Sequence, residues 1–234
     1  MQHPVIALTT QAHDFWFARA AVVVIVALQL LTSNTLHVGP GWLAPVVEVA
    51  LLIPLSIATG WAQGSARKAH TDTHLHIVLR TRRAIRWLAF FLTIVVSLFN
   101  FGALLLLIRA LISGHAGAAP VLLLDAANIW GTNIIIFALW YWNLDRGGPA
   151  ASGLVARSQP DFLFANMLQG ASAETDWSPG FIDYLYLSFT NATAFSPTDT
   201  LPLSQMAKVL MMFEASISLL TVALVAARAV NVLS

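Results

Sequence analysis

The sequence predicts an all-α, polytopic integral membrane protein with five transmembrane helices and one short re-entrant, pore-like helix. The first observation is composition: 58% of the 234 residues are hydrophobic and only 10% are charged, whereas soluble domains carry roughly 25% charged residues. The second is a series of five long apolar runs, since a helix needs roughly 20 such residues to cross a bilayer. The third is a further apolar run at 181–195, whose 15 residues are short for a span.

Composition also narrows the classes of function. The chain has no cysteine, which excludes disulfides, thiol catalysis and thiolate metal sites. The formal net charge is +1, and the Lys and Arg residues are not distributed as a nucleic-acid-binding surface requires. The sequence contains no phosphate-binding loop, dinucleotide-binding glycine motif, zinc-protease motif or hydrolase nucleophile elbow. We therefore expect a protein that is not an enzyme, has no cofactor and binds no nucleic acid.

Residues 1–144 are predicted to form a four-helix transmembrane region, and a fifth span ends the chain. The five runs are Phe15–Leu31, Trp42–Trp61, Trp87–Ile112, Val121–Leu144 and Leu203–Leu233. Tryptophans stand at several of their ends, where indole rings favour the lipid–water interface. The first run lacks the basic segment and the small-residue cleavage site of a signal peptide, so we expect it to be retained as a helix.

Residues 145–180 are predicted to be an acidic, irregular linker. Groups such as Gly147-Gly148-Pro149 and Ser178-Pro179-Gly180 are typical of turns. From residue 145 to residue 202 the chain carries two basic residues against six acidic ones. The last part, 181–234, is expected to contain the pore-loop-like helix, a turn and the terminal transmembrane helix.

Half of the basic residues lie in one short predicted loop at 64–86. Six of the twelve Lys and Arg residues fall there, and only Asp72 offsets them. Because basic loops remain on the cytoplasmic side of a membrane, we predict that this loop is cytoplasmic. Five spans then place the N-terminus inside, the C-terminus outside and the acidic segment on the cytoplasmic side as well.

An ionisable residue inside a membrane span costs free energy, so its presence suggests a functional role. We single out four such residues: Glu48, Arg109, Asp125 and Glu214. In an up-and-down bundle the first three fall in the same leaflet, so they can form an intramembrane charge cluster in which each charge has a partner. A proton or ion relay through these groups is the alternative.

Polar residues follow one face of the last helix. Glu214, Ser218, Thr221 and Arg228 recur at helical spacing and fall on one stripe. The third and fourth spans carry similar stripes, with Asn100 and Asn128 among their members. One interpretation of such stripes is hydrogen bonding between helices, in which each contact stabilises the bundle by roughly 0.6 kcal/mol. The sharper interpretation is a hydrated pathway or a subunit interface.

A histidine-rich stretch raises the question of a metal site. His70 and His74 would share a face of a helix, whereas His74 and His76 would point the same way on a strand. A solvated basic loop explains them better, because no Cys or Glu completes the ligand set and nearby cations oppose a metal ion. The sequence therefore predicts no metal site, with these histidines as the candidates if one exists.

The segment Tyr184–Lys208 carries the strongest local pattern, Y-L-Y-L-S-F-T-N-A-T-A-F-S-P-T-D-T-L-P-L-S-Q-M-A-K. We expect a short amphipathic helix that ends in Thr193, an irregular stretch, and then Asp199 and Pro202 leading into a long helix. This order resembles the pore module of tetrameric potassium channels, in which a pore helix precedes a T-V-G-Y-G-D filter, a proline and an inner helix. The resemblance implies that Thr193 precedes the filter and that Asp199 ends it.

The filter itself differs from that of the potassium channels. Where the family has V-G-Y-G, this chain has Phe195-Ser196-Pro197-Thr198. Glycines allow the backbone angles that aim carbonyls at the ion, while Pro197 fixes φ and removes an N–H. We therefore expect no potassium-type carbonyl ladder. The hydroxyls of Thr193, Ser196 and Thr198, together with a ring of Asp199, could line a less selective cation pore.

Three short patterns extend a second resemblance over more of the chain. They are Pro160-Asp161-Phe162, the Y-L-Y-L-S-F-T run from Tyr184, and the S-x-x-D-T turn from Ser196. With the four preceding spans, these are similar to an uncharacterised family of bacterial inner-membrane proteins. The resemblance implies a multi-pass protein of the inner membrane and brings no known activity.

The leading functional hypothesis is a degenerate ion-channel-like protein in the lipid bilayer, tetrameric if it conducts, that passes monovalent cations with low selectivity. The ion-path candidates are Thr193, Ser196, Thr198, Asp199, Glu214, Ser218 and Thr221. A non-conducting structural or partner-binding membrane protein is the first alternative. A small-solute or proton-coupled carrier using Glu48, Asp125 and Glu214 is the second. A potassium-type pore enters from outside, which conflicts with a cytoplasmic basic loop, and we give the charge rule more weight.

Overall fold

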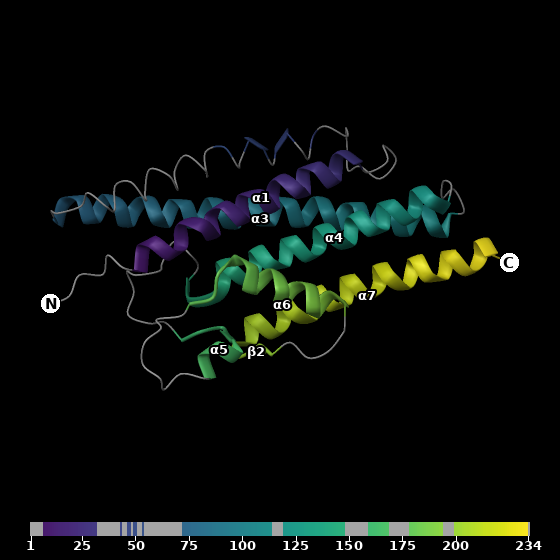
Figure 1. Ribbon diagram of the computed structural model, residues 1–234. Coiled ribbons are helices and arrows are strands. Elements are labelled where there is room, and N and C mark those ends of the chain that lie inside the picture. The colour runs from purple at the N-terminus through teal and green to yellow at the C-terminus, as the bar shows by residue number, and fades with distance from the viewer. Residues whose placement is uncertain are drawn as a thin grey trace.

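A computed structural model describes residues 7–31, 43, 46–47, 49–50, 53, 72–113, 119–147, 159–168, 178–193 and 199–233. This part of the chain is mostly helical (Figure 1). The elements are α1 (Ala7–Leu31), α3 (Asp72–Ile112), α4 (Ala119–Leu144), the 3-10 turn η1 (Asp145–Gly147), β1 (Phe162–Leu163), α5 (Ala165–Leu168), α6 (Phe181–Thr193), β2 (Leu201–Pro202) and α7 (Gln205–Leu233).

Three helices are long and apolar enough to cross a membrane, which supports the prediction of a helical membrane protein. They are Ala84–Ile112 in α3, Pro120–Leu144 in α4 and Gln205–Ala227 in α7. The apolar part of α1, Trp16–Leu30, is shorter. Most of the predicted second span, 42–61, lies outside the described residues. The number of spans therefore stays a prediction.

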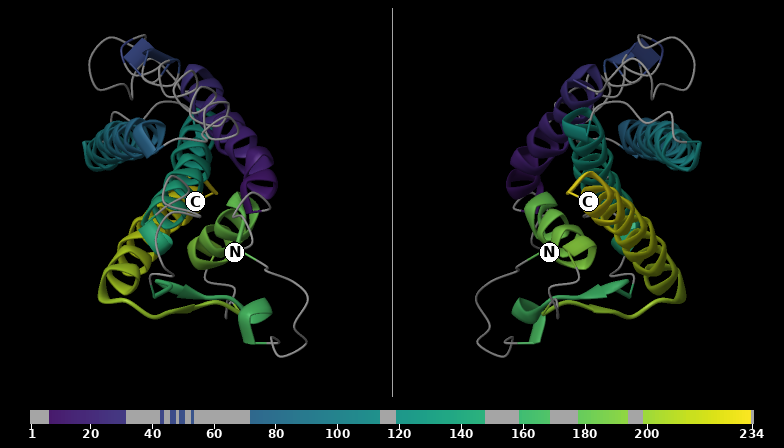
Figure 2. Two further views of the ribbon diagram at one scale, coloured as in Figure 1. Left: turned by 90° about the vertical axis from the view of Figure 1, so that its left-hand side faces the viewer. Right: turned by 90° about the vertical axis from the view of Figure 1, so that its right-hand side faces the viewer.

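Helix α4 is the centre of the bundle. In the most apolar stretch of α4, 61% is buried inside the protein, whereas the buried share of the corresponding stretch is 33% in α3 and 17% in α7. It packs against α1, α3, α6 and α7, which surround it in the end-on views (Figure 2). Ala138 and Tyr141 in its second half are fully buried, whereas Leu123 and Leu124 near its start are exposed.

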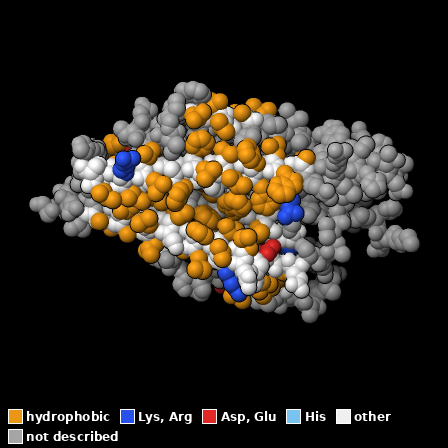
Figure 3. All heavy atoms as spheres, turned by 180° about the vertical axis from the view of Figure 1, so that it is seen from behind, with side chains coloured by type: hydrophobic (Ala, Val, Ile, Leu, Met, Phe, Trp, Pro, Cys, Tyr) orange, Lys and Arg blue, Asp and Glu red, His pale blue; other side chains and the backbone are white. Residues whose placement is uncertain are grey.

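The outer helices present their apolar residues outward. Phe91 and Leu98 on α3, and Met212 and Leu219 on α7, are exposed. Hydrophobic side chains cover much of the described surface on the face seen in Figure 3, and the Lys and Arg side chains lie toward the margins of that surface. A water-soluble monomer rarely exposes so large an apolar area, whereas lipid chains would solvate it.

Helices α3 and α4 run antiparallel, as the short connection between them requires. The indole of Trp140 packs against Phe90 with ring centroids 5.9 Å apart, and its Nε1–H donates to the hydroxyl of Ser97 at 3.0 Å. Near the other end Leu104 and Leu107 pack with Leu122. Trp140 thus bonds to a polar residue of the neighbouring helix.

One end of the bundle collects several chain segments, and we call it the Asp145 end. Here the ring of Phe181, at the start of α6, lies 5.5 Å from that of Trp142. The short strands pair in antiparallel register, Phe162 with Pro202 and Leu163 with Leu201. The Leu203 N–H then donates to the Asp161 carbonyl at 2.8 Å. The chain therefore leaves and re-enters the bundle at a single end.

Local sequence signals explain where α6 and α7 begin. The Asp183 carboxylate accepts a hydrogen bond from the Gly180 N–H at 2.7 Å, the reciprocal half of a capping box. The Ser204 hydroxyl accepts one from the Ala207 N–H at 3.1 Å, as an N-cap residue does. Helix α6 ends at Thr193, as predicted.

Two expectations about the connecting segments need correction. Residues 64–86 were expected to be a loop, but α3 begins at Asp72, so four of the six arginines and lysines lie on a helix. The apolar Leu75, Ile77, Val78 and Leu79 favour that extension. The 145–180 segment contains η1, β1 and α5 among its described residues, so it is more regular than predicted. The β1–β2 pair is also an addition to an all-α fold.

Candidate functional site

A buried glutamate on α7 is the centre of the candidate site. Glu214 lies in the tenth position of α7 and is fully buried. Its partners come from two other helices, Tyr141 on α4 and both Ser188 and Asn191 on α6. We call these four residues the Glu214 cluster. It joins the three elements that pack most extensively in this half of the bundle.

One carboxyl oxygen of Glu214 accepts two hydrogen bonds. The Tyr141 hydroxyl donates to Oε2 at 2.5 Å, and the Asn191 Nδ2 donates to the same atom at 2.6 Å. Asn191 also donates to the Met211 carbonyl at 3.0 Å. A backbone carbonyl only accepts, so this contact fixes which end of the amide faces Glu214.

The other carboxyl oxygen meets Ser188. The Ser188 Oγ contacts Oε1 of Glu214 and also lies 2.6 Å from the carbonyl oxygen of Ile134 on α4. Ser188 is fully buried. A single hydroxyl therefore links all three helices.

The predicted polar stripe on the last helix continues from Glu214 inside the bundle. Ser218 accepts a hydrogen bond from Asn133 Nδ2 at 3.0 Å, and Thr221 bonds to the carbonyl of Ile217 on its own helix. Both residues are buried, like Glu214. The stripe thus faces α4 and α6 within one chain, as the hydrogen-bonding interpretation of such stripes expects.

The remaining ion-path candidates do not join this stripe in the described residues. Thr193 bonds to the carbonyls of Phe189 and Thr190 within α6. Asp199 is exposed. Ser196 and Thr198 lie outside the described residues. The filter-like turn itself therefore stays a prediction.

The predicted charge cluster is described only in part. Asp125 is buried in the first third of α4, and Arg109 is exposed in the last turn of α3. Glu48 lies outside the described residues. The pairing of these three groups stays a prediction.

The histidine positions are likewise described in part. His74 and His76 belong to α3, so they are separated by roughly 200° around its axis and the strand alternative is wrong. His70 lies outside the described residues. Within the described part of the chain, no group of three potential metal ligands comes together.

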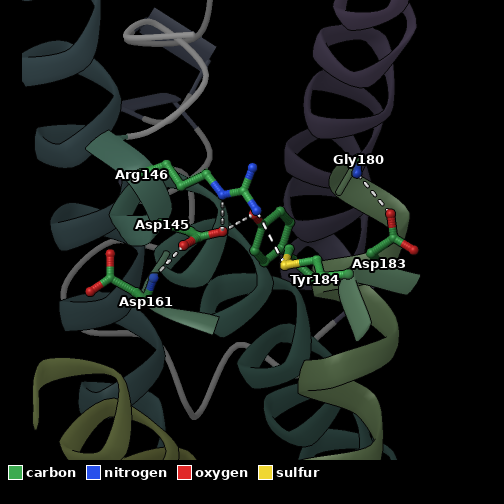
Figure 4. A network of polar contacts seen from close by, with 7 residues as sticks. Asp145, Arg146, Asp161, Gly180, Asp183 and Tyr184 are labelled. Atoms are coloured by element: carbon green, nitrogen blue, oxygen red, sulfur yellow. Dashed lines mark hydrogen bonds and ion pairs between the residues drawn. The ribbon is translucent and has the colours of Figure 1, made fainter. Parts of the chain in front are cut away.

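A second polar cluster lies at the Asp145 end (Figure 4). Asp145, in η1 just after α4, is buried although its neighbour Arg146 is partly exposed. Its Oδ2 accepts a hydrogen bond from the Tyr184 hydroxyl at 2.6 Å, and its Oδ1 accepts one from the Asp161 N–H at 2.6 Å. The Arg146 Nε lies 3.9 Å away, and Arg146 Nη2 contacts the Met167 sulfur at 3.2 Å.

Burial dominates the electrostatics of this second cluster. It raises the pKa of Asp145 above its ordinary value, and the hydrogen bond from Tyr184 opposes the shift. Burial also raises the pKa of Tyr184, to which the negative charge of Asp145 adds. The arrangement therefore favours the protonated form of both groups.

An aromatic ring separates the two clusters. Phe162 of β1 is fully buried. Its ring centroid lies 5.1 Å from that of Tyr141 and 6.3 Å from that of Tyr184. The Asp145 and Glu214 clusters are thus neighbours without a hydrogen-bonded connection through this ring.

In comparisons with protein-family models, curated proteins and solved structures, nothing matches this chain.

The sequence analysis missed Tyr141, Ser188, Asn191 and Asp145. A signal was present for α6: Tyr184, Ser188 and Asn191 stand four and three residues apart, which places them on one helix face. Tyr141 lies between two tryptophans, so it resembled part of an interfacial aromatic belt. Asp145 directly follows an apolar span and resembled the start of a solvated loop.

Proposed function

We propose that the protein is a non-conducting, structural or partner-binding protein of the inner membrane with five spans, in which α6 and the chain after it form a closed re-entrant hairpin. The observation that carries the proposal is the position of the Glu214, Ser218 and Thr221 stripe. It is buried inside one chain against α4 and α6.

The path of α6 supports the re-entrant part of the proposal. Helix α6 starts beside Trp142 of α4, and its Phe189 reaches Trp130, with ring centroids 6.2 Å apart. The 13 residues of α6 correspond to about 20 Å of helix, more than half of a hydrocarbon core of about 30 Å. The chain is back at the Asp145 end by Leu201, in β2.

The contrast with a pore supports the non-conducting part. The ion-path hypothesis needs the polar face of α7 to line a hydrated pathway. Here the polar face of α7 is occupied by partners in its own chain. Its exposed face carries large apolar residues such as Met212, Phe213 and Leu219, which suit lipid or a protein partner.

Charges favour a cytoplasmic position for the Asp145 end. Arg86 near the start of the α3 span, Arg146 after α4, and Lys208 in the first turn of α7 all belong to this end, whereas Arg109 and Arg228 belong to the other. By the positive-inside rule the end with more basic residues is cytoplasmic. The hairpin would then enter from the cytoplasm, opposite to a potassium-channel pore loop.

Planar-bilayer recording tests the proposal. Purified protein of verified oligomeric state should give no cation current above that of the empty bilayer, with a channel of known conductance as the positive control. A current that Asp199→Ala changes would overturn the proposal and restore the pore hypothesis. Asp199 is the informative position because it is exposed and contributes to neither buried cluster.

A proton-coupled carrier is the second candidate. The observation in its favour is that Asp125 and Glu214, both within spans, are buried, since intramembrane carboxyl groups often mark proton or substrate paths. It predicts pH-dependent solute uptake that Asp125→Asn or Glu214→Gln abolishes. Uptake that both variants retain would remove it.

A further inference from the structure

We infer that Glu214 is a proton-binding site inside the membrane, occupied at neutral pH, and that its carboxylic acid donates a hydrogen bond to Ser188. The inference concerns the protonation state of one group and does not depend on whether the protein conducts ions or acts as a scaffold.

The Ser188 hydroxyl faces more acceptors than it has hydrogens. Its Oγ lies within hydrogen-bond distance of two acceptors, the Ile134 carbonyl at 2.6 Å and Oε1 of Glu214. A hydroxyl has one hydrogen to donate. If Glu214 were a carboxylate, one of these contacts would bring two oxygens together with no hydrogen between them. A proton on Oε1 removes the conflict, because Glu214 then donates to Ser188 and Ser188 donates to Ile134.

The other side of the carboxyl group agrees with this assignment. Oε2 accepts from Tyr141 and Asn191, which is what the carbonyl oxygen of a carboxylic acid can do with its two lone pairs. The two Asn191 amide hydrogens serve Glu214 and the Met211 carbonyl. Each of these contacts thus joins one donor to one acceptor when a single proton is added to the glutamate.

The surroundings offer no charge that would favour a carboxylate. From α4 the titratable group that faces Glu214 is Tyr141, and from α6 the facing groups are the uncharged Ser188 and Asn191. From α3 and β2 no charged side chain among the described residues contacts Glu214. An unpaired carboxylate in a low-dielectric interior is costly, and such groups usually take up a proton instead.

Infrared spectroscopy of the reconstituted full chain at neutral pH tests the inference. A protonated carboxyl group has a C=O stretch at higher wavenumber than a carboxylate, and it shifts on transfer to D₂O. We expect this band in the wild type and its loss in Glu214→Gln. Glutamine is a close replacement for the neutral acid, since its amide can donate to Ser188 while its carbonyl accepts from Tyr141 and Asn191.

Matched variants make the assignment specific. Asp125→Asn and Asp145→Asn should leave the Glu214 band in place, because both carboxyl groups lie outside the Glu214 cluster. If Glu214→Gln folds and loses no carboxylic acid band, the inference is wrong. If that variant fails to fold, Ser188→Ala decides: removal of the hydrogen-bond acceptor should shift the band to higher wavenumber, and an unshifted spectrum would overturn the inference.

Discussion

The hydroxyl of Tyr184 donates to Oδ2 of Asp145 at 2.6 Å and thereby fixes the first half of α6 to the end of α4. The same carboxyl group receives the N–H of Asp161 on its other oxygen. Asp145 therefore positions both the strand that closes the hairpin and the helix that enters the bundle.

The stability of the protein should depend on pH through Asp145. Burial raises its pKa in the folded state, so the folded state binds the proton more tightly than the unfolded state. The corresponding stabilisation is complete below the unfolded pKa, about 3.9, and is lost as pH rises through the folded value. Thermal unfolding in detergent at a series of pH values should show this loss. Asp145→Asn should reduce the slope, and an unchanged slope would contradict the assignment.

Tyr141→Phe should destabilise the bundle by about 1 kcal/mol, since it removes one hydrogen bond to Glu214 and keeps the buried ring. Chemical unfolding in mixed micelles measures the difference. Tyr186→Phe is the matched control, because Tyr186 lies on the same end of the bundle with its side chain exposed. Equal effects of the two substitutions would argue against a special role for the Tyr141 hydroxyl.

Asn133 and Ser218 should show a direct energetic coupling. A double-mutant cycle with Asn133→Ala and Ser218→Ala is expected to give roughly 0.6 kcal/mol, the average for hydrogen bonds between membrane helices. Ser216→Ala serves as the control, because the Ser216 hydroxyl bonds to the Met212 carbonyl of its own helix. Additive effects of Asn133→Ala and Ser218→Ala would mean that the two side chains are not bonded in the membrane.

Arg146 adopts a left-handed backbone conformation, with φ of 51°. A side chain at such a position costs roughly 1–2 kcal/mol that glycine avoids. Arg146→Gly should therefore be more stable than Arg146→Ala by about 1 kcal/mol, the reverse of the order inside a helix. Thermal unfolding measures the stability of the two variants. Greater stability of the alanine variant would show that the backbone at position 146 is not strained.

Cysteine labelling should place both ends of the hairpin on one side of the membrane. The chain has no cysteine of its own, so single substitutions report cleanly. Ile182→Cys and Asp199→Cys should react with a membrane-impermeant reagent from the same side, and Arg109→Cys from the opposite side. Reaction of positions 182 and 199 from opposite sides would show that α6 crosses the bilayer and that the hairpin does not exist.

The sequence predicted the helices better than the site. Hydropathy and length located the spans in α3, α4 and α7, because lipid-facing and core residues are both apolar there. The end of α6 at Thr193 and the inward stripe on α7 also follow from periodicity. Local patterns could not show that Ser188 and Tyr141 meet Glu214, because the three residues come together only through packing of α4, α6 and α7. The histidine and arginine stretch was taken for a loop because charge obscured the helical continuation of α3.

The position of Phe162 has a consequence for proton transfer. Protons move through proteins along chains of donors and acceptors, and a benzene ring supplies neither. The ring between Tyr141 and Tyr184 therefore interrupts a direct proton relay from the Asp145 carboxyl group at the end of the bundle to the Glu214 carboxyl group in its interior.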